Sequence, residues 1–193
     1  MTTELILLLG GARSGKSRQA VDLATASGRP VVFLATGAAR DEEMRDRIAR
    51  HRQERPAGWR TIERVRNLGP AIAALPAESL VILDGLGDVA TDYLLAAQPP
   101  GGEGFSAADL AGVEERVRIE VDGLVTGRQR SGCTLIVVSN EVGLGLVPPY
   151  PLGRHYRDIL GRANQRLAAA AGTAVLLVAG LPLVLKGSWP PVL

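Results

Sequence analysis

The chain has 193 residues, a formal net charge of +2 and one cysteine, Cys133. This length suits one domain with a full core, and a single cysteine excludes an intrachain disulfide and fits a reducing cytoplasm. The small charge and few aromatic residues argue against nucleic-acid binding. No apolar run is long enough to span a membrane, and the N-terminus lacks the basic segment of a signal peptide. We therefore expect one cytoplasmic domain over residues 1–193, with an irregular tail over 187–193.

The first predicted elements flank a glycine-rich motif. Leu5–Leu9 predicts a buried strand and Ser17–Ala26 a helix. The residues between them fit G-x-x-x-x-G-K-[ST], the phosphate-binding loop: Gly10, Gly11, Ala12, Arg13, Ser14, Gly15, Lys16 and Ser17. Backbone N–H groups and the helix N-terminus of such a loop bind phosphate. We expect Lys16 to act in catalysis on the β/γ-phosphates and Ser17 to ligate Mg²⁺. Only two of the 22 basic residues are lysines, which favours a specific need for the compact charge of Lys16.

A second apolar run begins at Pro30 and predicts a strand that ends at Ala35, Thr36 and Gly37. In a parallel α/β sheet, ligands bind beyond the carboxyl ends of the strands. These three residues are therefore predicted to contact the nucleotide. The alternative for Thr36 is a purely local role as a strand cap.

The densely charged segment 40–55 predicts a helix. Met44, Ile48 and His51 share one face of it. Neighbouring arginines and partial burial would lower the pKa of the His51 imidazole and keep it neutral, which is its nucleophilic form. Spacing alone nevertheless favours a semi-buried structural histidine over a catalytic one. The arginines fit either a solvated face or a phosphate-binding cluster.

Three further elements follow Pro56, which ends this helix. Trp59–Glu63 predicts a short strand, and Asn67–Leu75 predicts a short helix. Leu80–Asp84 is an apolar run that ends in an acid. Beside a phosphate loop, such an aspartate holds Mg²⁺ directly or through water. Asp84 is therefore the second predicted magnesium ligand.

The C-terminal half continues the alternation of helix and strand after a loop over 98–106. We expect helices at 107–130 and 154–172, with strands at 134–139 and 174–179 and a short run beside the last of them at 183–186. Ala170 is predicted to face the core, and the loop from Asn140 to Gly145 to bind a ligand. The whole pattern predicts an α/β fold of the P-loop NTPase type, with a mostly parallel sheet and helices on both faces.

Four further blocks accompany the phosphate loop, in a fixed order. They are FLATG at Phe33–Gly37, DEEMRDRIARHRQERPAGWRTIE at Asp41–Glu63, SNEVGLGLVP at Ser139–Pro148 and LGRHYRDILGRANQRLAAAA at Leu152–Ala171. Together with GGARSGKSRQA at Gly10–Ala20, they resemble the bifunctional adenosylcobinamide kinase/adenosylcobinamide-phosphate guanylyltransferase family of cobalamin biosynthesis. The resemblance runs from about Leu5 to Lys186.

The resemblance implies two reactions. ATP or GTP phosphorylates the aminopropanol hydroxyl of (adenosyl)cobinamide, and GTP then transfers GMP to that phosphate, which gives the GDP-linked product. In the family GMP passes through a phosphoramidate on the histidine of the RIxxH block, here His51, so the resemblance reverses the interpretation from spacing. By position it assigns further residues to the guanylyl nucleotide: Arg52, Gln53, Glu54, Arg55 and Glu63. An acid such as Glu63 suits guanine because it can accept from two donors of the base.

The resemblance also implies a homo-oligomer, a trimer with sites where subunits meet, and leaves Asp84 to serve the metal or to orient the acceptor. His155 matches the family as well, with a structural or subunit-contact role favoured. The chain departs from the family pattern C-L-T-x-W after Asp84, where it reads Gly85–Val89, and it has Asp92 in place of an Asn. Two alternatives remain: a P-loop kinase of another small alcohol without transferase activity, and a non-catalytic nucleotide-binding regulator.

Overall fold

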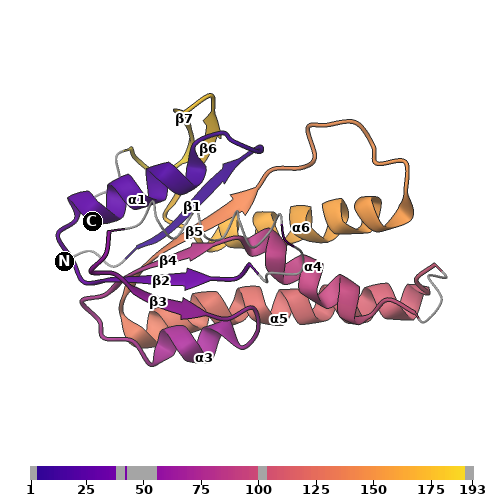
Figure 1. Cartoon of the computed structure of the whole chain (residues 1–193), viewed down its shortest axis with the longest axis horizontal. Helices are drawn as coiled ribbons and strands as arrows, with labels where there is room; N and C mark the ends of the chain where they lie inside the picture. Colours follow the sequence, from indigo (N-terminus) through magenta and orange to yellow (C-terminus); the bar gives the residue numbers. More distant parts are fainter. Residues whose placement is uncertain (1–3, 38–41, 43–55, 100–103, 190–193) are drawn as a thin grey trace.

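The computed structural model describes residues 4–37, 42, 56–99 and 104–189, which form one seven-stranded sheet with helices on both faces (Figure 1). The strands are β1 (Leu5–Gly10), β2 (Val31–Ala35), β3 (Arg60–Glu63), β4 (Leu80–Asp84), β5 (Thr134–Asn140), β6 (Thr173–Val178) and β7 (Leu181–Lys186). The helices are α1 (Lys16–Ala26), α3 (Leu68–Ala73), α4 (Leu86–Ala96), α5 (Ala107–Ser131) and α6 (Pro151–Ala170).

The sheet order is β3-β2-β4-β5-β1-β6-β7. Every neighbouring pair is parallel except β6 and β7, which are antiparallel. The prediction of a mostly parallel sheet is therefore confirmed, including the last short strand beside β6. Since β1 lies between β5 and β6, its phosphate loop leaves the middle of the sheet, at the edge where β4 and β5 also end.

Alternate residues of β1 serve two separate apolar layers, as expected for a strand buried on both faces. Leu7 and Leu9 pack with α3, α4, α5 and α6, whereas Ile6 and Leu8 pack with α1. Figure 1 shows α1 on one side of the sheet and the long helices α5 and α6 on the other. Among the described residues, α1 is the one helix on its face, so the helix cover is unequal.

The helix α5 is defined by its ends and by a close contact with α3. It begins with a capping box between Ser106 and Asp109 and ends at Gly132 in the left-handed region, with φ 74°. Near the C-terminal end of α5, a Cβ on Gly127 would lie closer to the backbone oxygen of Gly69 than any allowed contact distance. Glycine at both positions lets the two helix backbones touch.

A buried carboxylate joins the same two helices. Glu120 of α5 is 5 % exposed and accepts from the N–H groups of Asn67 and Leu68, at 2.7 and 3.0 Å. It also accepts from the Tyr93 hydroxyl of α4, at 2.9 Å. Two orphan N–H groups at the start of α3 are thereby satisfied by a side chain from another helix.

The structure differs from the sequence predictions at two helices. No helix was expected over α4, although its buried residues recur at helical spacing, because Gly85 and Gly87 at its start resemble a loop. The helix α6 starts earlier and ends at Ala170, which is exposed, while Ala171 is buried. The expectation for Ala170 is wrong because the backbone turns to an extended conformation at Ala171 to enter β6.

Other predictions keep their approximate bounds, and Cys133 is fully buried beside β5 as expected. Apart from Glu42, the helix predicted over 40–55 lies outside the described residues, as do residues 190–193 of the tail. Within the part of the chain that the structure describes, no helix has both the length and the apolar character to cross a bilayer.

Candidate nucleotide and phosphate-transfer site

The phosphate loop (Gly10–Ser17) turns back on itself between β1 and α1. Gly15, the N-cap of α1, has φ 94°, and Arg13 has φ 56°, so both are left-handed. The loop is closed by Ser14 N–H donating to the Gly11 oxygen at 3.3 Å. Lys16 Nζ donates to the same oxygen at 3.0 Å. The lysine ammonium therefore lies over the mouth of the loop, where phosphate charge would be neutralised.

The turn between β6 and β7 braces this loop from behind. Gly180 N–H donates to the Ser14 oxygen at 2.9 Å, and a Cβ on Gly15 would lie 3.2 Å from the Gly180 Cα. A Cβ on Gly10 would lie 2.8 Å from the Leu177 oxygen and still closer to Ser14 Oγ. Glycine is thus required at position 10 by close contacts, and at position 15 by its left-handed backbone as well as by a close contact.

Ser14 Oγ is buried and has no hydrogen-bond partner among the described residues. Buried hydroxyls nearly always have a partner. Its place inside a glycine-rich loop at a helix N-terminus fits a phosphate oxygen as that partner.

The two predicted magnesium ligands come together. Ser17 Oγ, at the start of α1, donates to Asp84 Oδ1, at the end of β4, at 3.1 Å. The strand β1, which leads to Ser17, and the strand β4, which ends at Asp84, are separated in the sheet by β5. A hydroxyl and a carboxylate are the hard oxygen ligands that Mg²⁺ takes, and Mg²⁺ needs only one or two protein groups when it also binds phosphates. The donor set therefore fits the metal.

Thr36 is buried and its hydroxyl is held by the turn that follows β4. Its Oγ1 lies 2.9 Å from the backbone oxygen of Asp84, 2.7 Å from the backbone oxygen of Gly85 and 3.4 Å from the carboxylate oxygen Oδ2 of Asp88. Gly85 is left-handed, with φ 109°. The Thr36 side chain thus holds the chain where it leaves β4, which fits the strand-cap alternative, and the Ser17–Asp84 hydrogen bond places this point beside the phosphate loop.

The remaining predicted nucleotide contacts fall into two groups. Ala35 pairs in register with both Asp84 and Glu63, so Glu63 lies on the same edge as the predicted magnesium ligands, two strands away from β4. Glu63 is exposed at the end of β3. Gly37 is half-buried just beyond β2. The others lie outside the described residues: His51, Arg52, Gln53, Glu54 and Arg55.

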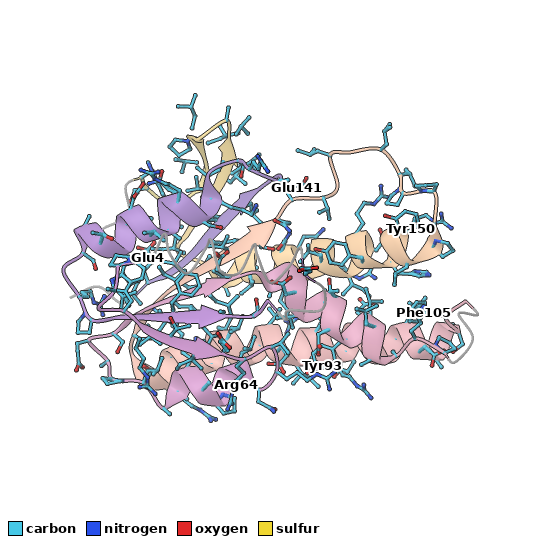
Figure 2. The ribbon with its side chains drawn as sticks, in the orientation of Figure 1. Glu4, Arg64, Tyr93, Phe105, Glu141 and Tyr150 are labelled. Atoms are coloured by element: carbon cyan, nitrogen blue, oxygen red, sulfur yellow. The ribbon has the colours of Figure 1, made fainter. Side chains whose placement is uncertain are left out.

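Two residues near the loop were not predicted as site residues. Asp88, in the first turn of α4, approaches Thr36, and Tyr156 of α6 makes a hydrogen bond with the Asn140 side chain. Burial raises the pKa of Tyr156, and the bond from Asn140 opposes that rise. Figure 2 shows Glu141 where β5 ends and Tyr150 across the following loop, at the start of α6. The sequence near Tyr156 could not indicate this role, because its contacts come from β5 and α4, which are distant in the sequence.

The fold and the loop define a nucleoside triphosphate-binding protein of the P-loop class. The RadB recombinase structure is similar in fold, with a TM-score of 0.51 and 12% identity over 97% of this chain and 83% of that one.

Sequence comparison is more specific. The family model for cobinamide kinase / cobinamide phosphate guanyltransferase matches residues 6–185. The bifunctional adenosylcobalamin biosynthesis protein CobU of Escherichia coli is 40% identical over 94% of this chain and 99% of its own length. The bifunctional protein CobP of Pseudomonas aeruginosa is 41% identical over 94% of this chain and 96% of its own. The chain belongs to the cobinamide kinase / cobinamide phosphate guanyltransferase family.

Proposed function

We propose that this protein phosphorylates the aminopropanol hydroxyl of (adenosyl)cobinamide with ATP or GTP and then transfers GMP from GTP to that phosphate, giving adenosylcobinamide-GDP. The observation that carries the proposal is a braced phosphate loop whose Ser17 meets Asp84, in a chain 40% identical to a bifunctional relative over nearly its whole length.

The kinase reaction uses the loop itself. Backbone N–H groups of the loop hold the phosphates, and Lys16 offsets the charge that develops on the transferred group. Ser17 and Asp84 would hold Mg²⁺, which supplies further neutralisation of the phosphate oxygens when bound. The acceptor oxygen forms a bond to the γ-phosphorus and releases its proton to water as the bond to the bridging oxygen breaks, and the nucleoside diphosphate leaves.

The transferase reaction adds His51. The lone pair of its neutral imidazole attacks the α-phosphorus of GTP, and the P–O bond to the bridging oxygen breaks as pyrophosphate leaves. An oxygen of cobinamide phosphate then attacks the same phosphorus, and the P–N bond breaks. In this proposal Lys16 and Ser17 hold pyrophosphate as the leaving group. The residues Arg52, Gln53, Glu54 and Arg55 border the nucleotide, and Glu63 accepts from guanine.

Labelling with α-³²P-GTP tests the transferase half. We expect acid-labile, alkali-stable label on the denatured protein, because a phosphoramidate has this stability. The chain has two histidines, so His155→Ala is the matched control. The His155 ring packs edge-on against Phe105, with ring centroids 5.9 Å apart, which fits a structural role. Label should survive in His155→Ala, be lost in His51→Ala, and be discharged by cobinamide phosphate.

The two lysines allow an equally matched test of the kinase half. Lys16→Ala should abolish phosphorylation of cobinamide, whereas Lys186→Ala should not. Lys186 Nζ donates to the Ala168 and Ala169 oxygens at the end of α6, at 3.1 and 3.0 Å, so its loss affects only a helix end. Kinase activity with no label on any variant would favour the simple kinase, and nucleotide binding without turnover would favour the regulator.

The proposal includes a cytoplasmic location and a homo-oligomer in the form of a trimer. Association between chains is supported by β7, an edge strand whose six residues are all exposed. Leu181 is 71% exposed, and Leu183 and Leu185 are also exposed. An uncovered apolar edge strand invites pairing with another chain. Light scattering of the wild type and of Leu183→Lys tests this; a monomeric wild type would contradict it.

A further inference from the structure

A group of polar side chains lies beside the phosphate loop on the α4–α6 face and has no role in the proposed function. It is centred on Asn140, the last residue of β5, which is paired in register with Gly10. The next N–H, that of Glu141, donates to the Gly10 oxygen at 3.1 Å. Asn140 is therefore fixed directly against the start of the phosphate loop.

Asn140 is also held from behind by α6. Asn164 Nδ2 donates to the Asn140 oxygen at 3.0 Å, and Ser139 Oγ donates to Asn164 Oδ1 at 2.6 Å. Ser139 is 1% exposed. These bonds set the position of the Asn140 backbone, so its side chain projects from a rigid support.

Tyr156 of α6 brings a hydroxyl to this side chain. Its oxygen occupies the space that a side chain at Gly87 would take: a Cβ there would overlap it and would lie 3.6 Å from Asn140 Nδ2. Burial raises the pKa of Tyr156. The bond with Asn140 lowers this pKa, as expected where an amide N–H donates to the phenol oxygen, but by less than burial raises it. The phenol therefore stays protonated at neutral pH and can donate to another group.

The group reaches the magnesium ligands through α4. The Asp88 carboxylate acts on the Tyr156 hydroxyl by its charge and lies 3.4 Å from Thr36 Oγ1. Thr36 contacts the backbone oxygen of Asp84, and the carboxylate of Asp84 accepts a hydrogen bond from the Ser17 hydroxyl. Polar groups thus run from Ser17 to Tyr156 along one edge of the sheet.

We propose that the Tyr156 hydroxyl, supported by Asn140 and seated on Gly87, binds the oxygen of the acceptor's aminopropanol arm. This inference rests on the proposed function. Phosphoryl transfer places the acceptor opposite the leaving group, on a side of the phosphate that the nucleotide does not fill. A neutral hydroxyl donor there suits an alcohol in the first reaction and a phosphate oxygen in the second.

The first test is Tyr156→Phe, which keeps the ring and removes the hydroxyl. We expect KM for cobinamide to rise about tenfold, the effect of one lost hydrogen bond. The KM for GTP and the rate of α-³²P labelling without acceptor should not change, while discharge of that label by cobinamide phosphate should slow. Tyr150→Phe is the control, because Tyr150 is 61% exposed.

The second test moves the hydroxyl from one helix to the other. In the Tyr156→Phe background, a Cβ at position 87 would lie 3.5 Å from the ring Cζ and 3.6 Å from Asn140 Nδ2, which are ordinary contact distances. Adding Gly87→Ser should therefore restore part of the affinity for cobinamide. Adding Gly87→Ala instead fills the same space without a hydroxyl and should restore none.

The outcomes separate this inference from the proposed function. A wild-type protein that does not phosphorylate cobinamide overturns both. An active wild type with an unchanged KM for cobinamide in Tyr156→Phe overturns only the role of Tyr156. Equal rises in the KM values for cobinamide and GTP would show a structural role and also overturn it.

Discussion

Glycine brings parts of the chain together in two regions of this molecule, for different purposes. In the phosphate loop, Gly10 and Gly15 let the backbone fold tightly and leave the buried Ser14 hydroxyl without a partner among the described residues. Between α3 and α5, Gly69 and Gly127 let two helix backbones touch. Beside this helix contact, Glu120 accepts from backbone N–H groups at the start of α3.

The difference teaches which property each region supports. A site for a ligand keeps donors and acceptors available, whereas a packing contact uses them within the protein. Substitutions between α3 and α5 should therefore lower stability and leave nucleotide affinity per folded molecule unchanged. Substitutions in the phosphate loop should lower the nucleotide affinity of the folded protein.

The largest effect on stability is expected for Gly127→Ala. The new Cβ would overlap the Gly69 oxygen, which is backbone and cannot rotate away, so α3 and α5 must separate. We expect a loss of about 3 kcal/mol, or roughly 6–12 °C in Tm for a domain of this size. Thermal unfolding followed by circular dichroism measures it.

The control for this change is Gly112→Ala in the same helix, where nothing lies within 4 Å of the new Cβ. Alanine has the higher helix propensity, so this variant should gain up to about 1 kcal/mol. If both variants unfolded at the wild-type temperature, the close contact between α3 and α5 would be refuted.

The next effect is expected for Glu120→Gln. Glutamine offers one carbonyl oxygen and turns an amide NH₂ group toward buried donors, so one of Asn67 N–H, Leu68 N–H or Tyr93 O–H loses its acceptor. A buried unsatisfied donor costs about 2 kcal/mol. Urea unfolding measures the change. Glu114→Gln is the control, because Glu114 makes a half-exposed salt bridge to Arg162 at 2.6 Å and should change stability by under about 1 kcal/mol.

These two regions were also unequally predictable from sequence. The phosphate loop and Asp84 follow from local spacing, because a strand, a motif and a helix must be contiguous to bind phosphate. Glu120 gave no such signal: a charged residue on an amphipathic helix is usually solvated, and its partners lie 52 and 53 residues away. Tyr156 and Gly87 likewise meet only because β5 places α6 beside α4.

The helix α4 shows a further limit of sequence reasoning. Its six buried residues recur at helical spacing, but the two glycines near its start resemble a loop. Helical periodicity is easily overlooked where glycines, which usually indicate a loop, stand at the start of the helix. The helix α1, on the other face of the sheet, was predicted within one residue because its motif fixes its start.

The third prediction tests the ligand-binding side of the comparison. Gly15→Ala places a Cβ at φ 94° and 3.2 Å from the Gly180 Cα. The backbone strain costs about 1 kcal/mol of stability, and the displaced N–H groups should lower affinity for GTP at least tenfold, about 1.4 kcal/mol. Isothermal titration with GTP measures the affinity.

A second left-handed glycine separates strain from binding. Gly28 follows α1 with φ 66°, and nothing lies within 4 Å of a Cβ placed there. Gly28→Ala should therefore cost a similar amount of stability and leave GTP affinity unchanged. Equal affinity losses in the two variants would mean that strain, and not the loop's N–H groups, governs binding.

The smallest effect is a pH dependence that belongs to the packing region. Burial first, and then the bond to Glu120, raise the pKa of Tyr93 to about 12, from 10.0. Above pH 10 the unfolded chain loses this proton before the folded protein does. The stability that Tyr93 contributes is therefore complete below pH 10 and is lost as the pH rises toward 12. Urea unfolding at intervals from pH 7 to pH 11 should show this decline.

Tyr93→Phe isolates the effect. It should be less stable than the wild type by about 1 kcal/mol at pH 7, because one hydrogen bond is lost, and should decline less steeply above pH 10. Tyr150→Phe removes an exposed phenol and should keep the wild-type slope. Tyr156, whose pKa is also raised, contributes in the same direction, so Tyr93→Phe flattens the curve only in part. An unchanged slope in Tyr93→Phe would mean that the Glu120 carboxylate does not hold this phenol in the folded protein, and the contrast with the ligand-accessible phosphate loop would then fail at this point.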